Sequence, residues 1–358
     1  MLSYLRNYLI ENNLEAILIT NLSNIRYLTG FKGSNAQVLI TLEKNYFLTD
    51  FRYKTYANEK IDKQEFEIVI YDQYYDILKE ILKDIKNLAI EENYTTLNAY
   101  SQLKKNLPQL SLISVSNVVE KLRAIKTNEE IEKIKKACSI AKELFEIILN
   151  FIKPEVMRER DIAIEMEYIA RKYLNAEDMA FETIVLSKER SAMPHGRASN
   201  RTILNNAPLL IDFGIVYDGY CCDITRTIWI GNRVDHDFIN TYDIVKNAIF
   251  LAEDVAKVGM KNVDLDKVVR EFLKSYGYDN KYFGHALGHS IGIEVHEFPV
   301  FSQKAEEYVL QGNEVFTIEP GVYIENKFGI RIEDSVVLNK ENNKISVLSD
   351  ITKELIKL

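Results

Sequence analysis

The sequence predicts an α+β protein of two domains, in which a smaller α/β domain precedes a larger one. Three observations predict this class. The chain has 358 residues, more than one hydrophobic core usually serves. Helical and strand patterns alternate over about the first 118 residues, as in an α/β domain. The second half instead shows pairs of strands separated by helices, which is typical of an α+β arrangement.

The first part of the chain supplies the elements of the smaller domain. Residues 2–12 carry apolar side chains at helical spacing, and residues 16–20 are an apolar run that suits a buried strand. Further strands are expected at residues 37–41, 46–49, 68–71 and 88–90. No glycine-rich phosphate loop occurs among these elements.

A helix start marks the boundary between the two domains. Thr127 and Glu130 are spaced as a capping box, in which each side chain accepts a hydrogen bond from the backbone amide of the other. Apolar residues follow at helical spacing until Pro154 ends the pattern. We therefore place the domains at residues 1–120 and 121–358.

Four strand patterns stand out in the second domain. Continuous strands are expected at residues 208–215, 220–230, 314–318 and 330–337. The acidic residues that suggest a binding site lie in or beside these four strands.

Composition limits the classes of partner and compartment. Hydrophobic residues make up 47% of the chain, charged residues 27%, and the net charge is −8, so attraction to nucleic acid or anionic lipid is not expected. No apolar run reaches the ~18 residues of a membrane span, and the N-terminus lacks the features of a signal peptide. Only Cys138, Cys221 and Cys222 occur, too few for a disulfide framework. We expect a soluble cytoplasmic protein.

The first acidic pair is Asp212 and Asp223, in two strands joined by a loop centred on residues 217–219. If the hairpin is symmetric about the midpoint of this pair, the two carboxylates lie directly opposite each other, ~5 Å apart at Cβ. Like charges held this close repel unless a cation lies between them. The pair therefore indicates a metal site.

A second pair, Glu319 and Glu333, has its midpoint at Asn326 and would face each other across another hairpin. His285, His289 and His296 lie between the two hairpins. Four carboxylates and an imidazole suit two divalent ions such as Mn²⁺, Co²⁺ or Zn²⁺. Two such ions can activate a shared hydroxide.

Each of these residues also has a structural interpretation. A single aspartate beside a turn is usually a turn residue, and a lone histidine among glycines is more often structural than a ligand. The presence of all the elements in order favours a site. We interpret Cys221 and Cys222 as packing residues, because four carboxylates already supply the ligands.

The motifs around these residues resemble the pita-bread metallopeptidases, in particular the proline-specific branch of aminopeptidase P and prolidase. SAMPHGRAS, IDFGIVYDGYCCDITRT, GHALGHSIGIEVHE, TIEPGVYI and GIRIED carry the resemblance over about residues 120–340. YLTGFKGSNAQVLIT and FLTDFRY resemble, more weakly, the family's smaller domain. The resemblance implies a C-terminal pita-bread (creatinase/aminopeptidase-like) domain after a creatinase-like α/β domain.

The resemblance also implies a role for each site residue. The metal ligands would be Asp212, Asp223, His289, Glu319 and Glu333. His195 and His296 would hold the scissile carbonyl and stabilise the oxyanion, and Glu319 would also transfer protons. His285, Tyr323 and Arg331 would line the substrate pocket or orient the ligands.

By this resemblance the chain is expected to be an Xaa-Pro aminopeptidase with two divalent ions, of which Mn²⁺ is favoured. A strict Xaa-Pro dipeptidase is the alternative, for which Arg197 is a candidate cation for the proline carboxylate. A non-catalytic peptide-binding module is a remote third interpretation. The expected partners are small peptides with proline in the second position and a second copy of the chain in a homodimer.

Overall fold

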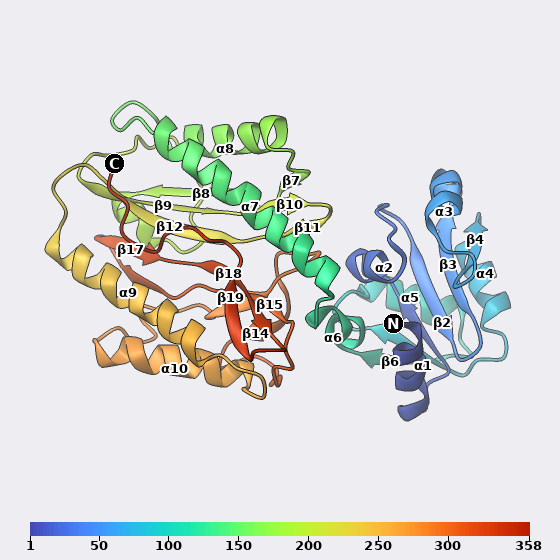
Figure 1. The fold of residues 1–358 in the computed structure, drawn as a ribbon. Coiled ribbons are helices and arrows are strands. Elements are labelled where there is room, and N and C mark those ends of the chain that lie inside the picture. Colours follow the sequence, from blue (N-terminus) through green and yellow to red (C-terminus); the bar gives the residue numbers. More distant parts are fainter. The chain divides into compact units, whose positions relative to one another are not determined.

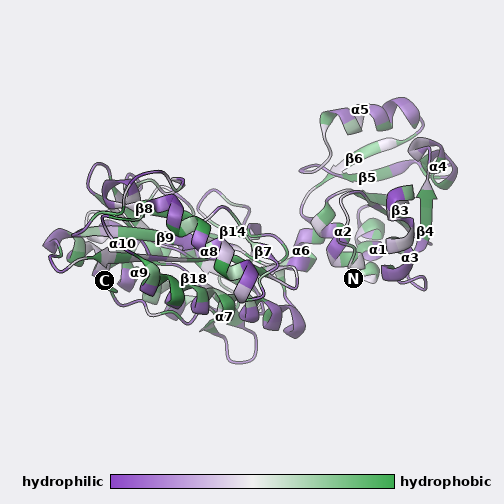
Figure 2. Ribbon diagram, turned by 90° about the horizontal axis from the view of Figure 1, so that it is seen from above, coloured by the Kyte–Doolittle hydropathy of each residue, from purple (hydrophilic) through white to green (hydrophobic).

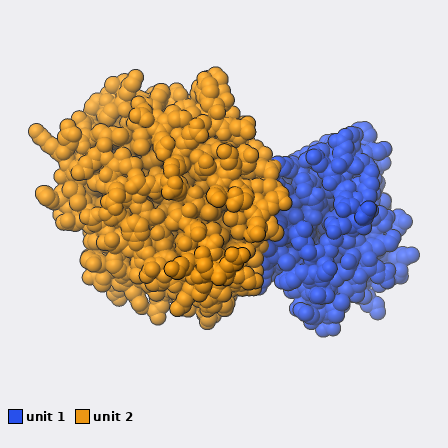
Figure 3. All heavy atoms as spheres, viewed as in Figure 1, with its two compact units in different colours: residues 1–123 blue, residues 124–358 orange.

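The computed structural model describes residues 1–358 and divides into two compact units, residues 1–123 and residues 124–358 (Figure 3). None of its helices combines the length and the apolar character needed to cross a membrane.

Unit 1 is built on one six-stranded mixed sheet of order β4-β3-β2-β1-β5-β6 (Figure 1). Strand β2 pairs antiparallel with both β1 and β3, and the other three pairings are parallel. The strands are β1 Ala16–Ile19, β2 Gln37–Thr41, β3 Asn45–Asp50, β4 Glu67–Tyr71, β5 Asn87–Glu91 and β6 Ser111–Val115. The helices are α1 Leu2–Glu11, α2 Leu22–Thr29, α3 Lys54–Lys60, α4 Tyr74–Ile81, α5 Leu97–Asn106 and α6 Val118–Ala124, with the short turn η1 Phe51–Tyr53.

Both faces of this sheet are buried. Ile17 on one face of β1 belongs to a core that includes side chains of α1, α2 and α3, whereas Leu18 on the other face packs with α4 and α5. A strand covered on both sides needs apolar residues at successive positions. This requirement explains the unbroken apolar run of residues 16–19.

Unit 2 places several sheets between two pairs of helices. Helices α7 and α8 share one core with β9 and β12, and α9 and α10 share the other with β15, β17 and β18 (Figure 1). The helices are α7 Asn128–Phe151, α8 Glu159–Tyr173, α9 His236–Val255 and α10 Asn262–Ser275, with the turn η2 Lys188–Ala192. The strands are β7 Asp178–Met179, β8 Ile184–Ser187, β9 Ala207–Phe213, β10 Ile215–Tyr217, β11 Tyr220–Cys221, β12 Ile224–Ile230, β13 Gly288–Ser290, β14 Glu297–Phe301, β15 Val315–Ile318, β16 Gly321–Ile324, β17 Phe328–Arg331, β18 Asp334–Asn339 and β19 Lys344–Val347.

The covering helices are amphipathic, and the central strands are not. Every residue of β9 and of β12 is buried, whereas α8 carries both hydrophilic and hydrophobic residues (Figure 2). Helix α7 begins with the predicted capping box of Thr127 and Glu130, and it ends before Pro154 as predicted. Polar groups that lie among the fully buried strands are therefore costly unless they are paired or bind a ligand.

Three of the four strands predicted in this unit are interrupted. The run predicted at residues 208–215 breaks at Gly214, that at 220–230 breaks at residues 222–223, and that at 330–337 breaks at residues 332–333. At the breaks, backbone groups bond across sheets: Glu333 N donates to Thr225 O (3.1 Å), and Asp223 N donates to the Ser335 hydroxyl (3.1 Å). Alternating side chains could not indicate these breaks, because the partners are distant in sequence.

The register predicted for the first hairpin is wrong by two residues. Asp212 pairs with Thr225, not with Asp223. The turn has only two central residues, Asp218 and Gly219, both with positive φ (43° and 74°), as an Asp-Gly hairpin turn requires. The two aspartates therefore share a face but lie diagonally rather than directly opposite.

The register predicted for the second hairpin is confirmed. The pairs Ile318↔Asp334 and Gly321↔Arg331 are both symmetric about Asn326. Glu319 directly follows Ile318 and Glu333 directly precedes Asp334, so the two glutamates lie at equivalent positions on the two strands of the hairpin.

Candidate metal centre and active site

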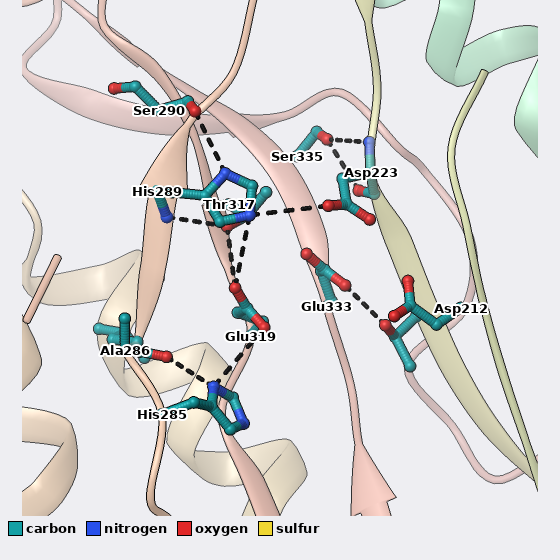
Figure 4. A network of polar contacts seen from close by, with 12 residues as sticks. Asp212, Asp223, His285, Ala286, His289, Ser290, Thr317, Glu319, Glu333 and Ser335 are labelled. Atoms are coloured by element: carbon teal, nitrogen blue, oxygen red, sulfur yellow. Dashed lines mark hydrogen bonds and ion pairs between the residues drawn. The ribbon is translucent and has the colours of Figure 1, made fainter. Parts of the chain in front are cut away.

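Five sequence-predicted residues meet in unit 2 although each comes from a different point in the chain. Asp212 lies in β9 and His289 in β13. Asp223, Glu319 and Glu333 lie in the breaks before β12, after β15 and before β18. Figure 4 shows their side chains pointing toward one another. The breaks thus turn three carboxylates out of regular strand geometry at the point where the sheets meet.

The distances within this cluster are those of groups arranged around a shared ligand. His289 Nε2 lies 3.6 Å from Asp223 Oδ2 and 3.6 Å from Glu319 Oε1 (Figure 4). One ligand atom each from Asp223, His289 and Glu333 lie within 4.8 Å of one another. These spacings leave room for a cation that contacts several side chains at once.

The carboxylates of the cluster are buried without enough partners. Asp212 Oδ1 and Asp223 Oδ1 are buried and accept no hydrogen bond. Burial raises the pKa of Glu333 to about 8, and the nearby charge of Asp212 adds to the rise. Burial, and next the charge of Glu333, also raises the pKa values of Asp223 and Glu319. The protein alone therefore does not compensate the negative charge that it gathers here.

The imidazole of His289 is held in the neutral form that a metal ligand needs. Burial lowers its pKa to about 3, with a further contribution from His296. Its Nδ1 lies 3.2 Å from Ser290 O, which leaves Nε2 directed at the carboxylates. Nitrogen and oxygen donors of this kind fit borderline or hard divalent cations. The orphaned oxygens and the neutral imidazole therefore fit a metal site.

A chain of hydrogen bonds connects the cluster to the residues behind it. Arg331 Nη2 donates to Asp212 Oδ2 (2.5 Å), and Nη1 donates to the Tyr323 hydroxyl (2.8 Å). The Tyr323 hydroxyl lies 2.9 Å from His285 Nε2, and His285 Nδ1 lies 3.7 Å from Glu319 Oε2. Burial, and next the charge of Arg331, lowers the pKa of His285 to about 3. This chain fixes the orientation of one carboxylate and one histidine at once.

The cluster opens into a cavity of about 310 Å³. His195 and His296 line it together with His285 and the five clustered residues, and Tyr323 lies behind the lining. A larger hollow of about 730 Å³ beside α8 contains none of the five. A small cavity with few polar groups directed at one point is the usual form of a small-ligand site.

Some residues of the site were not predicted from the sequence. Thr225 donates its hydroxyl to Glu333 Oε2 (2.6 Å), and Phe181, Glu182 and Ile184 line the cavity. The corrected hairpin register, which pairs Thr225 with Asp212, could have identified the threonine. No pattern in the sequence marks the segment at residues 181–184.

The two cysteines beside Asp223 do not contribute to the cavity. Cys221 and Cys222 are buried in the hydrophobic core of α7 and α8, and both are free thiols. The Cys221 thiol lies 3.6 Å from Ile293 O, and Cys222 Sγ accepts a hydrogen bond from Ile215 N (3.3 Å). They pack as the sequence predicts.

Both units match known protein families. Residues 132–340 match metallopeptidase family M24, and residues 1–125 match the creatinase/prolidase N-terminal domain. The two matches together cover nearly the whole chain.

Similar proteins match over the full length. The Xaa-Pro dipeptidase of Pyrococcus furiosus is 36% identical, with 96% of each chain covered. The solved structure of an Xaa-Pro dipeptidase from Bacillus anthracis is 36% identical, with a TM-score of 0.93 and coverage of 100% of this chain and 99% of that one. That of an X-Pro aminopeptidase from Thermotoga maritima is 37% identical, with a TM-score of 0.85 and coverage of 97% and 98%.

These matches confirm two predictions made from the sequence. The resemblance to the proline-specific branch of the pita-bread metallopeptidases is confirmed by the relatives and the solved structures. The fold class is confirmed as well: an α/β creatinase-like domain precedes an α+β pita-bread domain.

Proposed function

Because this chain belongs to metallopeptidase family M24, we propose that it is a metallo-exopeptidase that cleaves the bond between an N-terminal residue and proline. The observation that carries the proposal is the buried cluster of four carboxylates and one neutral histidine, two of whose oxygens have no partner. The names of the relatives, Xaa-Pro dipeptidase and X-Pro aminopeptidase, support the choice of proline.

The family requires divalent metal ions, and Asp212, Asp223, His289, Glu319 and Glu333 are the residues that would hold them. When bound, two such ions supply Lewis acidity and lower the pKa of water from 15.7 to about 7. We propose that the native metal is Mn²⁺, because the four carboxylate ligands outnumber the single imidazole ligand. Co²⁺ or Zn²⁺ are the proposed substitutes.

The chain's own side chains perform the positioning and the proton transfer. His195 and His296 line the cavity and would donate hydrogen bonds to the scissile carbonyl oxygen as it becomes an oxyanion. Water adds to the carbonyl carbon, and Glu319 Oε2 takes the proton that water loses. Glu319 then delivers this proton to the proline nitrogen as the C–N bond breaks. His285, which lines the cavity, would flank the proline ring, and Tyr323 would hold His285 from behind.

Proline suits a site that does not need a donor on the nitrogen. Proline has no backbone N–H, and its ring fixes φ. A peptidase that must accept a hydrogen bond from that N–H cannot hold such a substrate. In the cavity, carboxylates and histidines surround the reacting atoms, so recognition can depend on the shape of the ring.

The test is hydrolysis of Ala-Pro and of Ala-Pro-Ala by Mn²⁺-loaded protein, with a chelator control and release of alanine as the readout. Cleavage that chelation abolishes supports the proposal. Cleavage of the tripeptide identifies an aminopeptidase, and cleavage of Ala-Pro alone identifies a dipeptidase. Turnover of neither substrate by metal-loaded protein would contradict the proline-specific assignment, and metal binding without any peptidase activity would favour a peptide-binding module.

The exposed surface and the cysteine content bear on two further properties of the protein, its oligomeric state and its cellular location. We propose a homodimer, supported by the exposed apolar side chains Ile164, Tyr168 and Tyr173 of α8 and by the frequency of two-fold dimers. A molar mass of one chain, measured by light scattering, would contradict the homodimer.

We also propose a cytoplasmic location, supported by three buried cysteines that form no disulfide. Detection of the protein only outside cells after fractionation would contradict this location.

A further inference from the structure

The loop that presents His296 to the cavity is short and closed at its base. It joins β13 to β14, and its two ends pair where Ser290 lies opposite Glu297. The His296 ring lines the cavity, and its centroid lies 4.2 Å from that of the His289 ring. The place of His296 at the cavity therefore depends on what holds residues 291–296.

The carboxylate of Glu297 contacts this loop at two points. Its side chain is only 3% exposed, and Oε1 accepts a hydrogen bond from the amide of Glu294 (3.1 Å). At Gly292, a Cβ atom would lie 2.7 and 2.8 Å from the two carboxylate oxygens, closer than Cβ atoms approach other atoms. Glycine at this position therefore makes room for the carboxylate inside the loop.

A buried lysine compensates the charge of this carboxylate. Lys126 Nζ lies 3.2 Å from Glu297 Oε2, and the lysine side chain is only 1% exposed. Lys126 directly precedes the N-cap of α7, and its amide donates to Asn313 O (2.9 Å). Each of the two charges is costly to bury without the other, so each holds the other in place.

Other hydrogen bonds hold the start of the same loop. Gly292 O accepts one from Cys221 N (2.7 Å), and Ile291 N donates to Val315 O (3.1 Å). These bonds fix residues 291–292, whereas the Glu297 carboxylate holds the amide of Glu294, two residues before His296. The carboxylate therefore acts on the half of the loop that carries the histidine.

We propose that Glu297, with its charge compensated by Lys126, is a positioning residue for His296. This role rests on the proposed function, in which His296 donates a hydrogen bond to the oxyanion. Glu297 does not line the cavity, so it acts through the loop and not on the substrate. It keeps the loop in the conformation that places the His296 ring beside His289.

Glu297→Gln is the first test, because an amide has one oxygen where the carboxylate has two. That oxygen can accept from Lys126 or from the amide of Glu294, and the NH₂ group then faces the other donor. We expect kcat for Ala-Pro to fall about tenfold, a part of the roughly hundred- to thousandfold that one oxyanion donor supplies. KM should change by less than about twofold, because the oxyanion forms only in the transition state.

The double variant Lys126→Met/Glu297→Gln tests the part played by the lysine. Without Lys126 no buried charge is left unpaired, and the amide oxygen of Gln is available to the amide of Glu294. We expect kcat to recover to within about threefold of the wild-type value. A folded double variant with the same loss as Glu297→Gln, or a larger one, would contradict the pairing of these two residues.

A His296→Ala background distinguishes positioning from a general loss of structure. There Glu297 has no histidine left to position, so Glu297→Gln should change the remaining kcat by less than about twofold. An equal tenfold loss in both backgrounds would overturn the inference.

Amide hydrogen exchange of the full-length protein provides a readout that does not depend on activity. The Glu294 amide should exchange about tenfold faster in Glu297→Gln than in the wild type. Unchanged exchange over residues 291–296 would overturn the inference. A wild-type protein that cleaves no proline peptide would instead contradict the proposed function, and exchange would still decide whether Glu297 holds the loop.

Glu314→Gln is the matched control. Glu314 is a fully buried glutamate of unit 2 whose carboxylate also accepts loop amides, those of Gln311 (2.6 Å) and Gly312 (2.8 Å). That loop contributes no residue to the cavity. Glu314→Gln should therefore lower the thermal midpoint but keep kcat within about twofold of the wild type. A loss of kcat equal to that of Glu297→Gln would overturn the inference, because any weakened loop would then slow the reaction.

Discussion

Unit 2 contains two neighbouring buried clusters of charged side chains. Glu333 belongs to one cluster, and Asp334, the next residue in the chain, belongs to the other. The carboxylate–histidine cluster around Glu333 leaves two buried oxygens without a partner. Around Asp334, by contrast, the two buried oxygens that accept no hydrogen bond, Asp334 Oδ2 and Glu253 Oε1, each lie close to Lys353 Nζ, at 2.6 and 3.0 Å. We call the group of Arg226, Asp334, Lys353 and Glu253 the paired network.

The paired network connects the C-terminal segment to the central strands. Arg226 Nη2 donates to Asp334 Oδ1 (2.6 Å) and to Ile351 O (2.7 Å), and Arg226 Nε donates to Thr352 O (2.9 Å). Lys353 Nζ lies 2.6 Å from Asp334 and 3.0 Å from Glu253. Every charge in this group therefore faces an opposite charge or a carbonyl.

The difference separates a binding site from a structural element with similar chemistry. Burial costs free energy for any charged group, and the paired network offsets that cost with partners from the chain itself. The carboxylate–histidine cluster does not, so its cost is offset only when a cation binds. A substitution in the first cluster should impair binding and activity, and a substitution in the second should reduce stability.

The largest effect is expected for Asp223→Asn. This change removes the charge of one metal ligand and keeps the shape of its side chain. The rate of Ala-Pro hydrolysis should therefore fall by at least about a thousandfold, the magnitude expected when a group that stabilises the transition state is lost. The thermal midpoint of the chelated protein should stay equal or rise, because repulsion with Glu333 is relieved. A chelated variant that is strongly destabilised would show that Asp223 is structural instead.

Removal of metal is expected to act on the same cluster. Chelation should abolish activity and lower the thermal midpoint of the wild type, because bound ligand stabilises the native state. Asp223→Asn should show little change in its midpoint on chelation. Differential scanning calorimetry with and without chelator measures the thermal midpoints of the wild type and of Asp223→Asn. An equal decrease of the midpoint in both proteins would contradict the assignment of the metal to this cluster.

The paired network should respond in the opposite way. Arg226→Met leaves Asp334 buried with one cation fewer, and the free energy of unfolding should fall by about 3–5 kcal/mol. Chemical denaturation of chelated protein measures this loss. A loss that appears only when metal is present would indicate that Arg226 acts through the neighbouring carboxylate–histidine cluster.

The smallest effect is expected for Thr225→Val, at the boundary between the two clusters. The Thr225 hydroxyl donates to Glu333 Oε2 and accepts a hydrogen bond from Arg331 Nε. Loss of this orientation should reduce kcat for Ala-Pro by about tenfold, in the range for partners of metal ligands. Thr225→Ser, which keeps the hydroxyl, should retain near-wild-type kcat, and equal losses in both variants would contradict the explanation.

Sequence reasoning predicted the class of both domains, the capping box at Thr127 and the five residues of the carboxylate–histidine cluster, but not the segment at residues 181–184 that also lines the cavity. It did not predict the strand breaks at residues 222–223 and 332–333, because they depend on bonds between Asp223 and Ser335 and between Glu333 and Thr225. Alternation of side chains reports which face a residue occupies. It does not report which backbone group a distant strand will bond.

The same limit applies to the arginines. Arg197 and Arg331 are both next to predicted site residues in sequence terms, yet one is exposed with a single weak pair and the other is buried with all its donors engaged. The resemblance suggested different roles for the two arginines, and the structure supplies the burial and the hydrogen bonds by which they differ.

We infer that the carboxylate–histidine cluster binds metal and that the paired network is stable without it. Calorimetric titration of chelator-treated protein with Mn²⁺ tests it most directly, with Asp223→Asn and Asp334→Asn measured alongside. We predict two ions per chain for the wild type and for Asp334→Asn, and weakened or lost binding for Asp223→Asn. Absence of binding to the wild type, or equal binding by the wild type and Asp223→Asn, would contradict the account.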